Sequence, residues 1–375
     1  MEQYELRKII GIDALKLVSF RIIIVNEEIL HEAERKKFIE VEYASKASEI
    51  IGIRIVKDSL FKSLRWEKKK TSDKTYEVSS LELTVSADNN NLNPLLVDEI
   101  NARLSSINLH LLNDLGIEIR TDGFVVNEIE ANINIPMPKK FEDLLPLYRK
   151  LLANIPYFNR SYKESGKLIK LRDKDMDSSP TAYECCNQGK TVKGSIICYD
   201  KGEDLRRKKC MDLHDNILRI ELKASKNRTV KKLYGTTSWN EFTNERVYQA
   251  YFNNIISQIH LYLNSVYSPY CLKLGGKLIK KHKSKKNTWL VNLIKEIEQL
   301  NKRDIPLILD WQDLLPAFRA FDTYRHLSRV KGALERAATN TSIGHAYRIC
   351  LDLLLHEMDD IYNNGIVNTK ITIIK

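Results

Sequence analysis

Tyr199 and Lys201 lie two residues apart in the strand-like run SIICYDK, and Arg219 and Glu221 lie two apart in the similar run ILRIELK. Successive side chains of a strand point to opposite faces. Tyr199 and Lys201 are therefore expected on one face of their run, and Arg219 and Glu221 on one face of theirs. A tyrosine hydroxyl, a lysine and a nearby carboxylate can together cut a phosphodiester through a covalent intermediate. This chemistry is the leading hypothesis from the residues.

Such a reaction needs an activated tyrosine and an electrophilic phosphate. A free tyrosine has a pKa of about 10, so a cation such as Lys201 would favour the phenolate and the charged transition state. A divalent ion would polarise the phosphate, and carboxylate ligands favour Mg²⁺ or Mn²⁺. The expected metal ligands are Glu82, Glu130 and Glu221. Arg219 would either hold a phosphate or pair with an acid. In the alternative, the tyrosine only packs, and Arg219 and Glu221 belong to cross-strand ion pairs.

The elements around these residues follow from periodicity. Strands are expected at Leu17 to Val25, Phe38 to Tyr43, Glu49 to Val56 and Tyr76 to Ser86. Helical spacing of apolar residues predicts a helix from Val97 to Leu115 that stops at Gly116. A second helix is expected from Phe141 to Ile155, and the polar stretch from Tyr157 to Ala182 is expected to be a loop.

The strand at 129–135 alternates apolar residues with Glu128, Glu130, Asn132 and Asn134. Strands with one apolar and one polar face favour an α+β fold, in which an antiparallel sheet carries helices on one face. The other face is expected to be an open, polar and basic surface. Its projecting residues are expected to be Glu82, Glu130, Tyr199, Arg219 and Glu221.

The remainder of the chain is expected to form a smaller all-α C-terminal domain. Helical periodicity begins at Asn244, and short helices are expected at Leu290 to Leu300, Asp310 to Phe321, Thr323 to Ala338 and His345 to Tyr362. The predicted division is residues 1–235 for the catalytic domain and 236–375 for a helical domain that binds DNA or a partner.

The charge balance favours an anionic partner. Sixty Lys and Arg against 49 Asp and Glu give a net charge of +11, which indicates nucleic acid first and a membrane surface second, although a merely basic protein would look the same. The expected DNA-binding residues are Arg206, Arg207, Lys208, Lys280, Lys281 and Lys283. The segment Leu64 to Lys74 (LRWEKKKTSDK) is expected to be a hairpin tip or loop, either solvated or touching DNA with Trp66 as a stacking residue.

No membrane span or signal peptide is expected, and the six scattered cysteines show no paired CxxC spacing. The expected location is the cytoplasm of a bacterial cell, with no membrane partner.

Four segments resemble the replication initiators of filamentous phages and related plasmids, the gene II/X type. They are LELTVS, VNEIEANINI, KTVKGSIICYDKGEDL and ILRIELKASKNRTVKKLYG, within about residues 76 to 235. The resemblance implies a rolling-circle nuclease fold that nicks one strand of origin DNA, stays bound to the 5′ phosphate and later rejoins the strand. By position, Tyr199 matches the nucleophile and Lys201 its companion lysine, while Glu130 and Glu221 match acids of two strand motifs.

The chain departs from the family at two points. Glu128 stands where an arginine is expected, and the His-hydrophobic-His pair of the wider superfamily is absent. Since the sequence contains no Walker loop, the expected partners beside single- and double-stranded origin DNA are a host helicase and polymerase. The alternatives are a relaxase with the same chemistry, a non-catalytic origin-binding or copy-control protein, and an RNA-binding protein.

Overall fold

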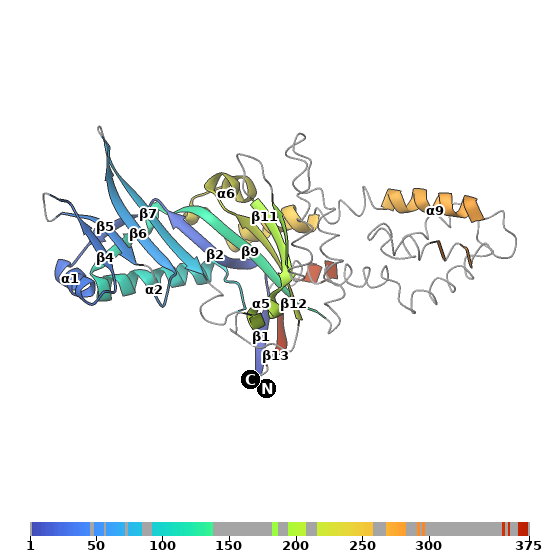
Figure 1. The fold of residues 1–375 in the computed structure, drawn as a ribbon, viewed down its shortest axis with the longest axis horizontal. Helices are drawn as coiled ribbons and strands as arrows, with labels where there is room; N and C mark the ends of the chain where they lie inside the picture. The colour runs from blue at the N-terminus through green and yellow to red at the C-terminus, as the bar shows by residue number, and fades with distance from the viewer. Residues whose placement is uncertain are drawn as a thin grey trace.

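The protein is an α+β structure built around a large antiparallel sheet (Figure 1). The computed structural model describes residues 2–45, 49–55, 58–71, 74–84, 92–137, 182–186, 194–207, 216–257, 268–282 and 367–373, and short pieces at 291–292, 295–296, 355–356 and 359–360. The expected helix at 141–155, the expected loop at 157–182, and almost all of the four expected helices between 290 and 362 lie outside these residues.

Nine strands form the main sheet, in the order β10-β11-β12-β9-β2-β7-β6-β5-β4, and all neighbours are antiparallel. In chain order they are β2 (Gly11–Val18), β4 (Glu40–Tyr43), β5 (Ile50–Ile55), β6 (Ser63–Lys70), β7 (Thr75–Thr84), β9 (Val125–Met137), β10 (Ala182–Cys186), β11 (Gly194–Asp200) and β12 (Asn216–Ala224). Two-stranded sheets pair β1 (Glu2–Lys8) with β13 (Val367–Ile373), and β3 (Arg21–Ile24) with β8 (Ile117–Arg120).

Helices connect these strands. The α-helices are α1 (Glu27–Arg35), α2 (Val97–Leu115), α5 (Lys201–Arg207), α6 (Asn227–Tyr234), α7 (Asn244–Tyr251) and α9 (Ser268–His282). Short 3₁₀ turns η1 (Thr121–Gly123) and η2 (Trp239–Glu241) and the π-helical turn η3 (Phe252–Ile256) complete the described elements.

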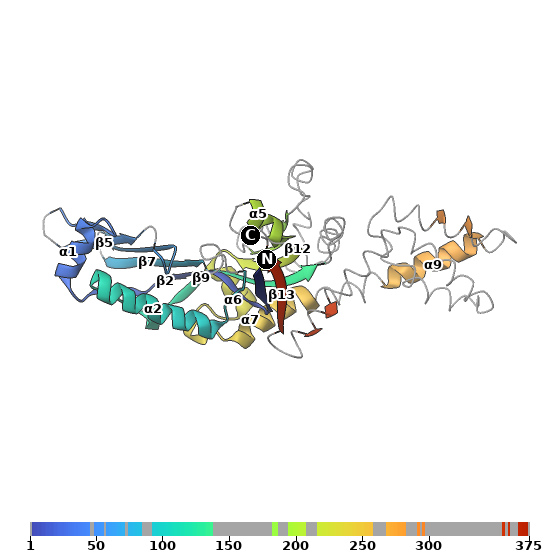
Figure 2. The same ribbon diagram turned by 90° about the horizontal axis from the view of Figure 1, so that it is seen from below.

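One face of the sheet is apolar and covered by helices. Figure 2 shows α2 and α7 on one side of the sheet and α5 on the other. Ile129, Ala131 and Ile133 of β9 are fully buried on the covered face, as are Leu218 and Ile220 of β12. Because their neighbours along each strand are polar, the alternation that the sequence predicts also sets which face the helices cover.

The prediction for α2 is confirmed to the residue. Its buried side chains recur at helical spacing from Val97 to Leu115, and Gly116 ends it in the left-handed region at φ 68°. A Cβ at Gly116 would lie 2.3 Å from the carbonyl oxygen of Asn26, so glycine is required both by the backbone angle and by the approach of the α1 segment.

The N-terminal strands differ from the prediction. The run expected at Leu17 to Val25 is split between β2 and β3, and Ser19 turns the chain between them with φ 66°. Three short helices (α1, α5 and α6) were not predicted. Trp66 is 2% exposed, and its Nε1 donates to Glu77, so the expected role as a stacking residue for DNA is wrong.

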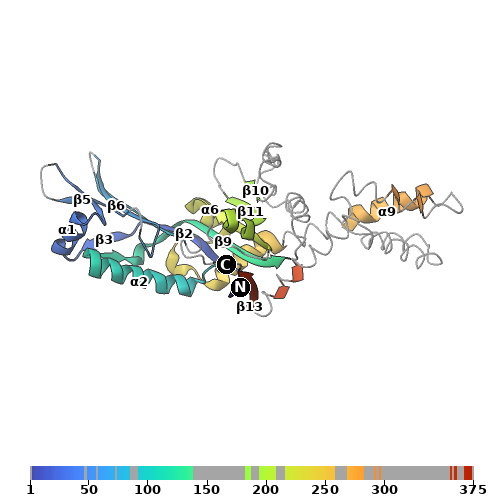
Figure 3. The same cartoon turned by 60° about the horizontal axis from the view of Figure 1, so that its bottom comes forward.

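The core that packs against the sheet also includes residues beyond 235. Trp239, Phe242, Val247 and Tyr251 belong to the core formed with the sheet. At the other end of the chain, β13 pairs with β1, so the N- and C-terminal strands lie side by side (Figure 3). Within the described residues, no helix is long and apolar enough to cross a membrane.

A histidine joins α2 to the loop before β6. His110 Nε2 lies 2.9 Å from Asp58 Oδ2, and Nδ1 lies 2.7 Å from Asp114 Oδ2. Burial lowers the pKa of His110, but the hydrogen bonds and charges of the two aspartates outweigh it, so the pKa is raised.

This raised pKa predicts a pH-dependent contribution to stability. A group whose pKa rises on folding contributes fully below its unfolded pKa, about 6.5 for histidine, and the contribution is lost as pH rises through the folded pKa. The difference in unfolding free energy between wild type and His110→Gln should therefore be larger at about pH 5.5 than at about pH 9, measured by urea unfolding. An equal difference at both values would contradict the proposed ion pairs.

Candidate active site

The strand register brings the predicted site residues onto the face opposite α2 and α7. Tyr199 lies directly across from Arg219, which in turn lies across from Asn134. Two residues along β12, Glu221 pairs with Asn132, and two further along, Lys223 pairs with Glu130. The expected common face for Tyr199, Arg219, Glu221, Glu130 and Glu82 is therefore present in the backbone register.

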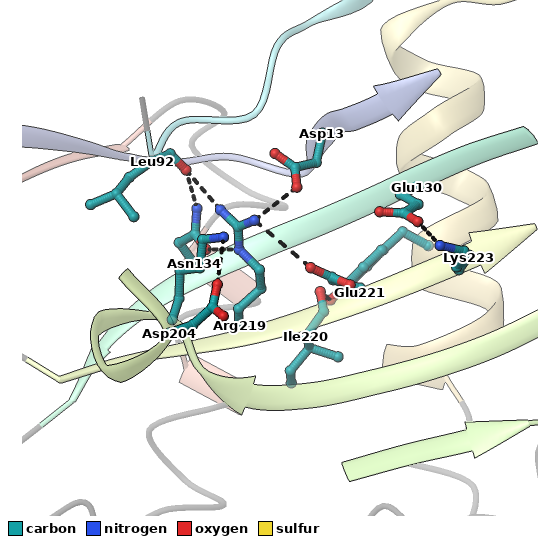
Figure 4. A network of polar contacts seen from close by, with 11 residues as sticks. Asp13, Leu92, Glu130, Asn134, Asp204, Arg219, Ile220, Glu221 and Lys223 are labelled. Carbon is teal, nitrogen blue, oxygen red and sulfur yellow. Dashed lines mark hydrogen bonds and ion pairs between the residues drawn. The ribbon is translucent and has the colours of Figure 1, made fainter. Parts of the chain in front are cut away.

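Arg219 is the most buried charge on this face, with 0% of its surface exposed. Its Nε donates to Asn134 Oδ1 at 2.7 Å, Nη1 to Asp13 Oδ2 at 2.9 Å and Nη2 to the carbonyl of Leu92 at 3.0 Å (Figure 4). Glu221 Oε1 lies 3.8 Å from Nη1. We call Arg219 and these four partners the Arg219 network. The expectation of an open surface is wrong here, because a buried guanidinium needs all of these acceptors.

A β-bulge directs Asp13 into the network. The β2–β9 register shifts between Ile12 and Ala14, which leaves Asp13 as the extra residue. Bulges re-aim a side chain relative to the regular alternation, and here the carboxylate reaches across β9 to Arg219 on β12.

The Leu92 carbonyl reaches Arg219 because Leu95 runs beside β2. Leu95 exchanges two backbone hydrogen bonds with Ile12, at 2.8 and 2.9 Å. A Cβ on Gly11 would lie 2.9 Å from the Leu95 oxygen. A glycine at position 11 therefore allows this close approach.

The alternation in SIICYDK predicts that Lys201 ends the strand. The strand instead ends at Asp200, and Lys201 is the first residue of helix α5. It is only 7% exposed, and its Nζ lies 3.3 Å from Asp204 Oδ2. Burial and the positive charge of Arg219 lower the pKa of Lys201, while Asp13 and Asp204 act in the opposite direction. The lysine and the arginine are thus close enough to interact electrostatically beside the strand end that carries Tyr199.

Two of the three expected metal ligands are held by lysines. Glu82 Oε1 accepts from Lys16 Nζ at 2.7 Å, and this hydrogen bond is the main cause of the lowered Glu82 pKa. Glu130 forms a close ion pair with Lys223. Burial alone would lower the pKa of Lys223, but Glu130 and the neighbouring acids raise it.

The three carboxylates do not converge on one point. Three strand spacings of about 4.8 Å separate β7, which carries Glu82, from β12, which carries Glu221. One ion cannot bind both, so the expectation of a site shared by Glu82, Glu130 and Glu221 is corrected. No group of three or more His, Cys, Asp or Glu placed for a metal occurs in the part of the chain that the structure describes.

Unpaired oxygens lie at the Arg219 network instead. Asp13 Oδ1 and both polar atoms of Asn132 are buried, and none has a hydrogen-bond partner among the described residues. Asn132 is 0% exposed and pairs in register with Glu221 on one side and Gly11 on the other. Orphaned buried polar atoms are costly. Carboxylate and amide oxygens suit Mg²⁺ or Mn²⁺, so Asp13, Asn132 and Glu221 fit a divalent ion by their chemistry.

Sequence reasoning missed Asp13 and undervalued the two asparagines. One signal was available, because a lone acid in the apolar run IIGIDALKLV predicts a buried partner of opposite charge. The partner itself is 206 residues away in sequence, and no local pattern specifies it.

The expected DNA-binding residues are placed only in part. Arg206 is half-buried in α5, and Arg207 ends that helix. Lys280 and Lys281 lie exposed on α9, with Lys281 2.7 Å from Glu296. Lys208 and Lys283 lie outside the described residues.

The Arg219 network predicts a large effect on stability. Arg219→Met removes the charge and leaves Asp13 buried without a counter-ion, which should lower the unfolding free energy by about 3–5 kcal/mol. Arg54 forms an exposed pair with Glu40 in the same sheet, so Arg54→Met should cost less than about 1 kcal/mol. Chemical denaturation measures both; equal midpoints would show that Arg219 does not hold the buried network together.

No protein-family model matches the chain, and no curated protein matches it either.

Proposed function

We propose that this protein is a rolling-circle replication initiator that nicks and rejoins origin DNA through Tyr199. The observation that supports it most is the register of β11 and β12. Tyr199 lies opposite Arg219 and two register pairs from the Glu221 position, on the face that also carries the unpaired oxygens of Asp13 and Asn132. The proposal therefore rests on a nucleophile position, two buried cations, and carboxylate and amide oxygens on neighbouring strands.

The proposed reaction is a reversible phosphoryl transfer. The Tyr199 hydroxyl loses its proton and attacks the scissile phosphorus, forming a phosphotyrosine as the bond to the 3′ oxygen breaks. The leaving 3′ oxygen takes up a proton and becomes the primer for a polymerase. Attack by a 3′ hydroxyl on the phosphotyrosine later reverses the step and reseals the strand, with the tyrosine as leaving group.

Lys201 and Arg219 would supply positive charge to this reaction. The burial of both residues strengthens electrostatic interactions with a phosphate that gains charge in the transition state. Burial also lowers the pKa of Lys201, which makes its ammonium a better proton donor than an exposed lysine. Arg219 is already held by Asp13 and Asn134, so its role is to orient the carboxylates and set the local charge.

Asp13, Asn132 and Glu221 would hold the divalent ion. When bound, the ion would supply Lewis-acid polarisation of the scissile phosphate. Glu130 is proposed to act through Lys223, since the two are already ion-paired, and Glu82 is left out of the site.

The same constellation would serve a relaxase of a mobile element. Both classes use the same tyrosine chemistry, and they differ in the DNA they act on. A non-catalytic origin-binding protein is less favoured, because basic residues alone would not require two buried carboxylates beside Arg219.

Loss of the tyrosine hydroxyl tests the covalent step. Tyr199→Phe should bind supercoiled DNA carrying the native origin as wild type does, yet form no nicked circles and no covalent protein–DNA adduct with Mg²⁺ or Mn²⁺ present. Tyr183→Phe is the matched control, because position 183 on β10 pairs with Cys198 and therefore lies on the opposite face. Nicking by Tyr199→Phe, or none by wild type with either metal, would refute the proposal.

Exchange of single carboxylates tests the ligand assignment. Glu221→Gln should raise the Mn²⁺ concentration needed for nicking at least about tenfold and weaken Mn²⁺ binding in calorimetric titration, since it removes an anionic ligand. Glu82→Gln removes the same charge three strands away and should leave both readouts close to wild type. A larger effect of Glu82→Gln than of Glu221→Gln on these readouts would contradict this assignment and indicate a metal site near Lys16 and Glu82.

A further inference from the structure

The β6–β7 hairpin extends beyond the sheet as a two-stranded ribbon. β6 pairs with β5 only from Leu64 to Glu67, and β7 pairs with β2 only from Ser80 to Thr84. The pairs from Lys68 to Lys70 with Thr75 to Glu77 therefore have no paired strand on either side within the described part of the chain. Figure 1 shows this ribbon rising away from the rest of the sheet. A ribbon without lateral neighbours can enter a space that the whole sheet cannot.

The ribbon is basic and mostly free of internal ion pairing. Residues 68–78 contain four lysines against Asp73 and Glu77, a net charge of +2. Lys68 is used in the fold, because it pairs with Glu49 and lies over the Trp66 ring. Lys70 and Lys74 are exposed without an ion-pair partner among the described residues, and Lys69 has only an exposed contact with Glu67. Such exposed lysines are available to phosphates.

The ribbon presents two large side chains on the same face as the candidate active site. Tyr76 is 47% exposed and Val78 is 40% exposed. Both lie on the same face of β7 as Ser80 and Glu82, since all four are two residues apart. Glu82 is on the face that carries Lys16 and Glu128. An exposed tyrosine and valine between lysines can contact base edges and the sugar backbone.

The register also fixes the distance between the ribbon and the site. Glu82, Lys16 and Glu128 lie in line across β7, β2 and β9. β7 and β9 run in the same direction, since each is antiparallel to β2. Asn132 lies four residues after Glu128 on β9, and Tyr76 lies six residues before Glu82 on β7. The two offsets therefore point in opposite directions along the strands and add to ten residues. Ten residues at about 3.3 Å each give about 33 Å along the strands. One turn of B-DNA is about 34 Å.

We propose that the β6–β7 ribbon binds the major groove of duplex origin DNA about one helical turn from the nick. The major groove of B-DNA is wide enough to admit a two-stranded β-ribbon, whereas the minor groove is only about 6 Å wide. Lys69, Lys70 and Lys74 would contact phosphates, while Tyr76 and Val78 face the groove. This inference rests on the proposed function, since it assigns how that site is positioned on its DNA.

Salt-dependent binding gives the first test. The probe is a mixed-sequence duplex several helical turns long, and the variant carries Lys69→Gln, Lys70→Gln and Lys74→Gln. Each lost phosphate contact should reduce the slope of log K against log salt by about 0.9, so the slope should fall by up to about 3. The control replaces Lys226, Lys231 and Lys232 with Gln, which removes the same charge from exposed positions in or beside α6. An equal loss in both variants would overturn the ribbon assignment.

Footprinting on the nicked origin gives the second test. Once the nick is mapped, wild type should protect guanine N7, which lies in the major groove, about ten base pairs away. The lysine variant should lose that protection but still cleave a single-stranded origin oligonucleotide. Unchanged protection in the variant would overturn the inference and leave the nicking proposal intact. Failure of wild type to nick any origin DNA would instead refute the proposed function.

Discussion

A buried guanidinium constrains the half of the sheet that carries the candidate active site. Arg219 has no solvent exposure, so its charge must be neutralised within the protein, and Asp13 on β2 does so across the intervening strand β9. Asn134 and the Leu92 carbonyl accept two of its other N–H groups. Three separate parts of the chain are thereby held at fixed distances. The bulge at Asp13, the close approach at Gly11 and the register of β12 depend on one another through this contact.

Charge pairing then divides the polar face into two kinds of region. Near β7 and β2, Glu82 is satisfied by Lys16, and near the far end of β12, Glu130 is satisfied by Lys223. Around Arg219, by contrast, buried oxygens of Asp13 and Asn132 have no hydrogen-bond partner among the described residues. Unsatisfied buried polar atoms are rare in folded proteins, and each calls for an explanation such as a bound ion, a bound water or a catalytic role. The polarity of the whole face is therefore a weak guide to chemistry, whereas the unpaired atoms indicate a specific place.

The elements that the sequence predicts well are those in which apolar residues recur at regular spacing over a long stretch without interruption. α2 places an apolar residue every third or fourth position over five turns, and β9 alternates from Glu128 to Ile135. The β2 strand was mispredicted because Ser19 interrupts an apolar run that continues on both sides. α5 and α6 are too short for their periods to stand out. The shared face of Tyr199, Arg219 and Glu221 follows from alternation, but the Asp13–Arg219 pair does not, because long-range pairing depends on strand order and a local bulge.

Strand order has a consequence for how the two ends of the sheet work together. The ribbon of β6 and β7 and the Arg219 network belong to one hydrogen-bonded ladder through β2 and β9, so no linker intervenes between them. Their separation is set by register, and a shift of one residue would turn every buried side chain of a strand to the other face. The cost of such a shift keeps the spacing constant. Under the proposed function, such a sheet would act as a spacer of fixed length between the basic ribbon and the proposed nicking site, which matches the constant helical repeat of duplex DNA.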